Sequence, residues 1–589
     1  MDNVSGIKHE IVLKGIPASP GIAIGKAYLY SKDVPRVEQW RIGDRHIAPE
    51  IERLNRAIQK SVKELQKILL FAQQKIGEAK AKILDAQIMM LEDKILIDAI
   101  HKRIQKEKLN AEYLVSDEIG KYAGMMMRAR DEYMHERAHD VEDLKNRIIR
   151  NLLQEKLISK LEGTVIIIAH TLTPADTMIL SRNHVLGYAT DVGGITSHAA
   201  LISRSLKIPA VVGLGDISRE AVSGDVMIID GYSGTIIVSP TPARIAEYEQ
   251  RREHFLQFER ELEGLKNLPA VSTDGHSVEL SANIELAEEM GYVVVQGSQG
   301  VGLFRTESLL IGRDDFPSEE DQVKEYKRVA ARIYPNRVIM RTFDIGGDKI
   351  APETAEEQNP FLGWRGVRVC FDHPGLFMNQ LRAMLRASTR KNIAIMFPMI
   401  STIQEVRRAK EFVRQAKEEL KSKKIRFDDK IPVGVMIEVP AAAMSAGLIA
   451  AEVDFLSIGS NDLIQYLLAV DRGNSLVSSL YREFEPSVLA TIKNVIDAGH
   501  KAGKWVGICG EMAGHPLAVP LLVGLGIDEL SVVPVVLPEI KKIIRSLSYK
   551  RMQEVAAATL AMTTSEEVES YLNGFMRREL PDIPLEKEY

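Results

Sequence analysis

Val433-Gly-Val-Met-Ile-Glu438 is a short apolar run that ends on a carboxylate, and it is the clearest indication of the fold of the C-terminal half. A run of this length, bounded by polar residues, is typical of a buried strand in a parallel sheet. Seven more such runs alternate with helical stretches beyond residue 270, at 278–284, 300–305, 338–343, 393–399, 455–458, 505–509 and 529–532. Eight strands in about 320 residues predict a closed (β/α)8 TIM barrel, with a doubly wound open sheet as the alternative.

Polar side chains follow five of these strands at their C-terminal ends, where a barrel of this type assembles its active site. They are Arg305, Arg341, Glu438, the pair Asn461-Asp462, and Cys509. Arginine suits an anion that carries both phosphate and carboxylate, because its planar guanidinium binds either group through two hydrogen bonds and stays charged. The arginines that fit this role are Arg305, Arg341 and Arg472, together with Arg365.

Two carboxylates and a thiol at the same strand ends suggest further chemistry. Glu438 and Asp462 offer hard oxygen ligands, and two carboxylates with substrate oxygens and water commonly hold Mg²⁺. The structural alternative for Glu438 is a buried carboxylate paired with a barrel arginine, and a structural role explains any single arginine equally well. Cys509 is either a small buried residue or an acid with a thiol proton to give. Cys370 follows no strand end and is predicted to be inert.

In the N-terminal half the most informative stretch is Asp191-Val-Gly-Gly-Ile-Thr-Ser-His-Ala-Ala200. Its paired glycines allow a sharp turn, and the residues after His198 have a helical pattern. The imidazole of His198 is therefore expected at a helix N-terminus, where free amide groups and the helix dipole favour a phosphate. The alternative is a histidine that only caps the helix or packs in the core.

The order of elements predicts a discontinuous first domain. Short strand patterns at 11–32 return at 164–169, 185–189, 210–212 and 225–229, whereas about 48–156 has helical periodicity, as at Leu54, Ile58, Val62 and Leu65. The clustered methionines of that block, Met89, Met90 and Met125 to Met127, are expected in its core, with an adaptable docking surface as the alternative. We predict an α/β domain of residues 1–32 and 151–242, an inserted helical subdomain of 33–150, a linker helix at 243–268 and the barrel at 269–589.

Composition excludes several classes of function. The net charge is −5 and the charged residues, 27% of the chain, form no basic stripe interleaved with aromatic residues, so nucleic acid is not expected as a partner. No apolar run approaches the roughly 20 residues that cross a bilayer, so membrane insertion is not expected. With two cysteines and no signal-peptide pattern, we predict a cytoplasmic protein.

Over nearly its full length the chain resembles enzyme I of the bacterial phosphotransferase system. The motifs that carry the resemblance are Gly194-Ile-Thr-Ser-His198, Gly302-Leu-Phe-Arg-Thr-Glu307, Arg341-Thr-Phe-Asp-Ile-Gly-Gly-Asp-Lys349, Met436-Ile-Glu-Val-Pro440, Ser460-Asn-Asp-Leu463 and Gly507-Ile-Cys-Gly-Glu511. Residues 18–25 resemble the opening strand of that family, and residues 131–143 resemble part of its HPr-binding helical subdomain. Related dikinases and phosphoenolpyruvate synthases share these signatures but need a nucleotide-grasping domain, for which 589 residues leave no room.

The resemblance implies a function and a role for each site residue. Phosphate would pass from phosphoenolpyruvate to Nε2 of His198, held by Thr177, and then to a histidine of the small carrier protein HPr. Cys509 would protonate the enolate carbon. The implied phosphoenolpyruvate contacts are Arg305, Arg341, Asn461, Asp462 and Arg472, and the implied Mg²⁺ ligands are Glu438 and Asp462. A swivelling phosphohistidine domain and a homodimer formed through the barrel are implied as well.

Two residues depart from the family pattern. Ile195 stands where many sugar-system members have arginine, which affects the choice of carrier, and Ser308 stands where an aromatic residue is common. The competing class of function is a scaffold or sensor that binds phosphoenolpyruvate without turnover. Its sequence would have lost the histidine, a metal carboxylate or an arginine, and none is lost here.

Overall fold

The computed structural model describes residues 9–30, 37–76, 87–126, 132–153, 164–181, 185–194, 197–310, 316–346, 359–474, 476–583 and 585. The chain divides into two compact units, one that reaches to Gln257 and one that runs from Phe258 to Leu585. Helix α9 (Pro242–Leu265) spans the boundary between them. Over these residues, no helix combines the length and the apolar character needed to cross a bilayer.

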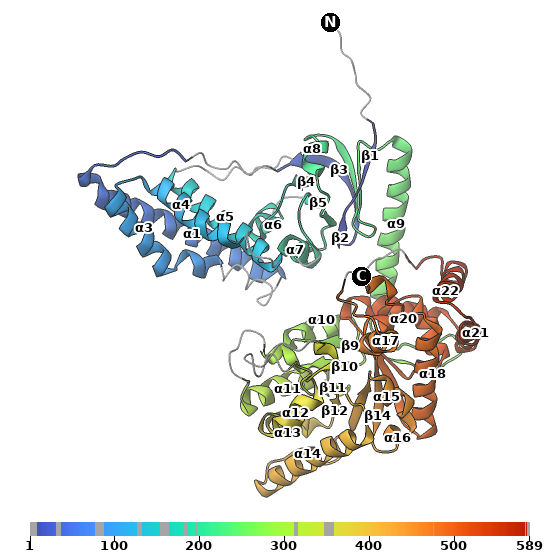
Figure 1. Ribbon diagram of the computed structural model, residues 1–589. Coiled ribbons are helices and arrows are strands. Elements are labelled where there is room, and N and C mark those ends of the chain that lie inside the picture. The colour runs from blue at the N-terminus through green and yellow to red at the C-terminus, as the bar shows by residue number, and fades with distance from the viewer. Residues whose placement is uncertain are drawn as a thin grey trace. The chain divides into compact units, whose positions relative to one another are not determined.

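The second unit is a closed barrel of eight strands, so the open-sheet alternative is wrong. Every neighbouring pair is parallel, and β9 completes the ring because it pairs with both β10 and β16. All eight predicted runs are strands: β9 (Glu279–Ile284), β10 (Val301–Arg305), β11 (Val338–Arg341), β12 (Ile393–Phe397), β13 (Val433–Ile437), β14 (Phe455–Gly459), β15 (Trp505–Cys509) and β16 (Glu529–Val532). Figure 1 shows these strands enclosed by helices.

The barrel helices follow from amphipathic sequence and local capping. In α14 (Ile403–Ser422), Val406, Ala409 and Val413 recur every three to four residues and are buried, and Thr402 caps the first turn reciprocally with Glu405. The other helices of eight or more residues are α11 (Glu319–Ile333), α13 (Pro374–Ala387), α17 (Ser460–Leu468), α18 (Pro486–Lys501), α20 (Leu537–Ser546), α21 (Tyr549–Leu560) and α22 (Ser565–Glu579). The shorter ones are α10 (Met290–Val295), α12 (Val367–Asp372), α15 (Pro440–Met444), α16 (Ala446–Ala450) and α19 (Ala518–Gly524).

The first unit contains an eight-stranded mixed sheet in the order β1-β8-β7-β3-β4-β5-β6-β2. Its strands are β1 (Ile11–Lys14), β2 (Ile16–Ser19), β3 (Ile22–Leu29), β4 (Val165–Ala169), β5 (Val185–Thr190), β6 (Ala210–Val212), β7 (Val226–Asp230) and β8 (Thr235–Val238). Strands of the first 30 residues therefore share one sheet with strands after residue 164. The hairpin strand β8 is absent from the sequence-based prediction. Helices α6 (Pro174–Leu180), α7 (His198–Leu206) and α8 (Ile217–Glu220) accompany the sheet.

Between β3 and β4 the chain forms a helical bundle (Figure 1). Its hydrophobic core also includes Met178 of α6 and Ile202 of α7. Its long helices are α1 (Ile47–Ile76), α3 (Lys94–Glu107), α4 (Ala111–Met126) and α5 (Glu132–Leu152). The predicted stripe of Leu54, Ile58 and Val62 is buried. The expectation that Met89 and Met125 lie in the core is wrong, because they are 72% and 59% exposed. Helical spacing alone does not distinguish the packed face from its flanks.

Candidate active site

A cavity of about 350 Å³ opens at the C-terminal ends of the barrel strands. All eight barrel residues that the sequence singled out line it: Arg305, Arg341, Arg365, Glu438, Asn461, Asp462, Arg472 and Cys509. They come from several different strands and the loops that follow, which only the closed barrel brings together.

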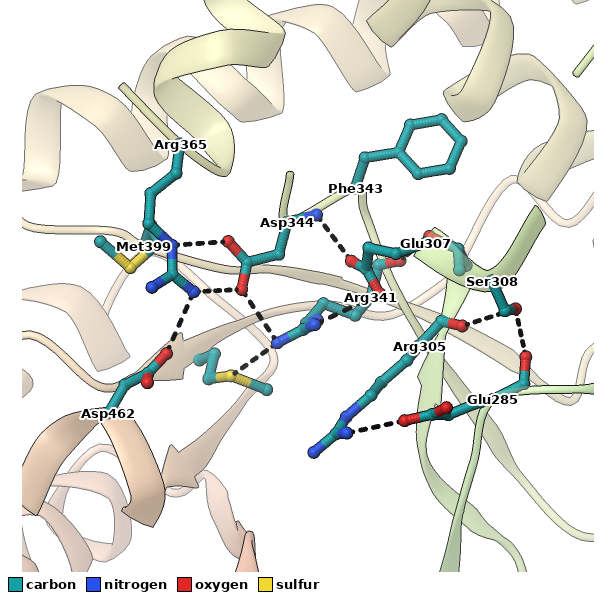
Figure 2. A network of polar contacts seen from close by, with 12 residues as sticks. Glu285, Arg305, Glu307, Ser308, Arg341, Phe343, Asp344, Arg365, Met399 and Asp462 are labelled. Carbon is teal, nitrogen blue, oxygen red and sulfur yellow. Dashed lines mark hydrogen bonds and ion pairs between the residues drawn. The ribbon is translucent and has the colours of Figure 1, made fainter. Parts of the chain in front are cut away.

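The inner part of the cavity is an ion-pair network built on Asp344 (Figure 2). Its buried carboxylate lies 3.2 Å from Arg341 and 2.8 Å from Arg365, which also reaches Asp462 at 3.2 Å. Burial opposes ionisation of Asp344, but the two guanidinium groups outweigh it and hold the pKa of Asp344 below its ordinary value. Glu307 lies 3.3 Å from Arg341 and accepts a hydrogen bond of 2.6 Å from the Asp344 N–H. These arginines are thus fixed in place before any ligand binds.

Glu438 is a buried carboxylate with excess negative charge around it. Burial, followed by repulsion from Asp462 and Asp344, raises the pKa of Glu438 to about 8. Its Oε1 accepts a 2.6 Å hydrogen bond from the Met399 N–H. Among the residues whose placement is described, no ion pair joins Glu438 to an arginine or lysine, although the charge of Arg341 acts to lower its pKa. The arginine of the predicted alternative is therefore present in the network, but without a direct ion pair to Glu438.

The donor set suits a hard divalent cation that the substrate helps to hold. A side chain at Gly459 would place its Cβ 2.9 Å from Oε2 of Glu438, so glycine keeps the space beside that oxygen open. Asp462 contributes the second carboxylate. In the described part of the chain no three histidine, cysteine or acidic side chains form a complete metal cluster. Two carboxylates fit an ion such as Mg²⁺, which keeps water and substrate oxygens as its remaining ligands.

At the rim of the cavity two more arginines pair with carboxylates. Arg305 lies 2.9 Å from Glu285, and Arg472 lies 2.6 Å from Glu511. Asn461 receives a 2.9 Å hydrogen bond on Oδ1 from the Glu511 N–H, and its own amide donates to Oε1 of Glu511 at 3.3 Å.

The sequence-based prediction missed four acidic residues of the cavity and its rim: Glu285, Glu307, Asp344 and Glu511. The signal was available, because Glu285 directly follows β9 and the other three lie within the quoted motifs. A position near a strand end does not show which carboxylate will meet which arginine, because the closed barrel sets those distances.

Cys509 ends β15, is buried, and is one of the residues that line the cavity. Sγ lies 3.6 Å from the Ile458 carbonyl oxygen and 3.8 Å from Oγ of Ser457. Burial raises the pKa of Cys509 to about 11, so the thiol keeps its proton at neutral pH. Cys370 is also buried, but it lies outside the cavity lining, 3.8 Å from the Phe343 carbonyl oxygen.

His198 lies in the other unit, at the first residue of α7. The turn after β5 includes Gly193 at φ 137°, a conformation that favours glycine, and Ser197 caps the helix by accepting from the Ala200 N–H at 3.4 Å. The backbone thus matches the predicted turn and helix start. Ile195 and the side chain of His198 lie outside the described residues.

Thr177, the predicted partner of His198, is fully buried in α6. Its hydroxyl donates a 3.0 Å hydrogen bond to the Thr173 carbonyl oxygen one turn earlier. Helix α6 packs against α7, so Thr177 and His198 belong to neighbouring helices.

Comparison with known proteins accounts for almost the whole chain. Family models of PEP-utilising enzymes match it in three segments: the N-terminal domain at residues 14–137, the mobile domain at 161–234 and the PEP-binding domain at 259–549. A phosphoenolpyruvate-protein phosphotransferase of Staphylococcus carnosus is 43% identical, over 94% of this chain and 97% of its own length. One from Listeria monocytogenes is 44% identical, over 94% of this chain and 98% of its own. With these matches and a barrel cavity of this composition, the chain belongs to the phosphoenolpyruvate-protein phosphotransferase family, the enzyme I family of PEP-utilising enzymes.

Proposed function

We infer that this protein transfers phosphate from phosphoenolpyruvate to its own His198, releases pyruvate, and passes the phosphate to the histidine of an HPr-type carrier. This would be the first step of a sugar phosphotransferase system in the cytoplasm. The observation that carries the proposal is the cavity at the barrel mouth. It is lined by four arginines, by a protonated thiol, and by the carboxylates Glu438 and Asp462, which are suited to bind a metal ion. The proposal is supported by sequence identity of 43% and 44% to two named phosphotransferases, over 94% of this chain.

The residues of the cavity match the chemistry of the substrate. Phosphoenolpyruvate carries a phosphate and a carboxylate, and we assign both to Arg305, Arg341, Arg365 and Arg472, with Asn461 as a neutral donor. Because Asp344 already fixes Arg341 and Arg365, these side chains lose little conformational entropy when phosphoenolpyruvate binds.

Enzymes of this family use a divalent metal, and we propose Mg²⁺ held by Glu438 and Asp462. When bound, the ion would neutralise negative charge on the phosphate. The buried Glu438 needs such a partner to ionise at neutral pH, since its pKa in the absence of metal is raised to about 8 by burial and by Asp462.

The transfer itself is an in-line displacement. Nε2 of neutral His198 forms a bond to phosphorus as the bond from phosphorus to the enol oxygen breaks, and the electron pair stays on enolpyruvate. Cys509 then gives its thiol proton to the enolate carbon, which yields pyruvate. We propose that Thr177 orients the imidazole.

Because His198 and the cavity belong to different units, we propose that the linker at 243–268 lets the α/β domain, residues 1–32 and 151–242, swivel. In one state His198 would meet phosphoenolpyruvate at the barrel of residues 269–589. In the other it would meet the carrier bound to the helical subdomain of residues 33–150. We also propose a homodimer formed through the barrel.

The decisive experiment is incubation of the purified protein with ³²P-labelled phosphoenolpyruvate and Mg²⁺. We expect acid-labile label on the wild type, no label on His198→Ala, and transfer of the label to added HPr. A wild-type protein that binds phosphoenolpyruvate but takes up no label would instead be a non-catalytic sensor.

A further inference from the structure

The four arginines of the cavity are held in two different ways. Arg341 and Arg365 are 11% and 13% exposed, and both pair with Asp344, which is itself 2% exposed. Arg305 and Arg472 are 39% and 40% exposed. The inner pair is therefore fixed by a buried charge, whereas the outer pair lies in contact with water.

The partners of the outer arginines are exposed as well. Glu285 is 55% exposed beside Arg305, and Glu511 is 72% exposed beside Arg472. Ion pairs this exposed are weak and are screened by salt. A dianionic phosphate that enters the cavity can therefore compete with these carboxylates, which it cannot do with the buried Asp344.

Ser308 keeps Glu285 next to Arg305 (Figure 2). Its hydroxyl donates to the Glu285 carbonyl oxygen and lies 3.3 Å from the Arg305 carbonyl oxygen. The loop after β9 is thereby tied to the end of β10. As a result, Arg305, which lines the cavity, is already paired with the opposite charge of Glu285.

On the basis of the proposed function, we propose that Glu285 is an affinity-determining counter-ion of the substrate site. It occupies the Arg305 guanidinium in the free protein and opposes the binding of phosphoenolpyruvate. If the carboxylate stays, it repels the incoming phosphate, and if it leaves, the ion pair is lost. In either case it weakens substrate binding, and it has no part in the bond-making step.

The test is calorimetric titration of phosphoenolpyruvate with Mg²⁺ into the full-length protein carrying His198→Ala, which binds without turnover. Adding Glu285→Gln should lower the Kd roughly two- to fivefold, the range expected for a half-exposed ion pair. The gain should shrink as salt is raised, because salt already screens the competing charge.

Glu288→Gln is the matched control. Glu288 lies three residues away and forms an ion pair of the same exposed kind, 2.7 Å from Arg328, but it does not line the cavity. Loss of the Glu288 charge should leave the Kd of phosphoenolpyruvate unchanged.

The outcomes are distinguishable. An unchanged or higher Kd for Glu285→Gln, or an equal gain from Glu288→Gln, would overturn the role of Glu285 and leave the proposed function standing. Absence of phosphoenolpyruvate binding to the His198→Ala parent would overturn the proposed function itself.

Discussion

At the scale of single residues, the site favours the charge of Asp344 and disfavours the charge of Glu438. In the absence of metal, burial and then Asp462 and Asp344 raise the pKa of Glu438 to about 8. In the unfolded chain the same carboxyl group ionises near its ordinary pKa of 4.5. Between these values the unfolded chain binds fewer protons than the folded one, so the free energy of unfolding falls as pH rises through that window.

Glu438→Gln should therefore stabilise the metal-free protein while it abolishes phosphorylation. The amide oxygen can still accept the hydrogen bond from the Met399 N–H, so packing is retained. With a chelator present, we expect the free energy of unfolding to rise by about 1–3 kcal/mol near pH 8, with no difference near pH 4. Calorimetric melts at both pH values would measure this difference between the variant and the wild type. A variant that melts at a lower temperature than the wild type near pH 8 would contradict the electrostatic explanation.

At the scale of elements, the start of α7 determines how His198 is presented. Ser197 caps the helix through the Ala200 N–H. Removal of such a cap typically costs about 1 kcal/mol of stability. An aspartate caps equally well, but it places a negative charge beside the site where the phosphate is proposed to sit.

Two substitutions separate the cap from the charge. Ser197→Ala should lower the free energy of unfolding of the first unit by about 1 kcal/mol, and Ser197→Asp should restore it. The rate of ³²P labelling should be lower in Ser197→Asp than in the wild type, because the aspartate carboxylate repels the phosphoryl group. Denaturant titration and labelling rates give the two readouts. Labelling of Ser197→Asp at the wild-type rate would mean that the phosphate is not held at this helix end.

At the scale of the whole molecule, the barrel cavity and His198, the proposed phosphate acceptor, belong to separate units, so turnover should require their relative motion. The chain allows a clean test, because both native cysteines are buried and the pKa of Cys509 is raised to about 11 by burial, which makes it a poor target for maleimides. One cysteine introduced on the surface of each unit can therefore be cross-linked selectively.

We expect the cross-linked protein to retain single-turnover labelling either from phosphoenolpyruvate or from phosphorylated HPr, but to lose cycling between them. The same cysteine pair without cross-linker serves as the control. Full steady-state turnover in several locked orientations would show that no swivel is needed.

The eight barrel strands and eight of the polar residues that line the cavity could be predicted from the sequence alone. Apolar runs such as 433–438 identify buried strands because burial on both faces leaves a continuous local signature. The polar residue at the end of a strand is just as local, which is why Arg341, Glu438 and Cys509 could be named in advance. The strand β8 was missed because a strand is recognised by the partners with which it pairs, and these lie elsewhere in the chain. The exposure of Met89 was missed because helical spacing does not show which face of a helix is packed.

The pairing of charges in the cavity could not be predicted from the sequence, because it depends on how the barrel closes. Arg341 and Arg365 are 24 positions apart in the chain, yet both contact the carboxylate of Asp344. Glu285 is held against Arg305 by a hydroxyl from Ser308. Ion pairs depend on distances of a few ångströms between side chains on different strands, and closure of the barrel sets those distances. The residue types of the site could therefore be read from the sequence, whereas their division into buried inner arginines and half-exposed outer arginines arose from the fold.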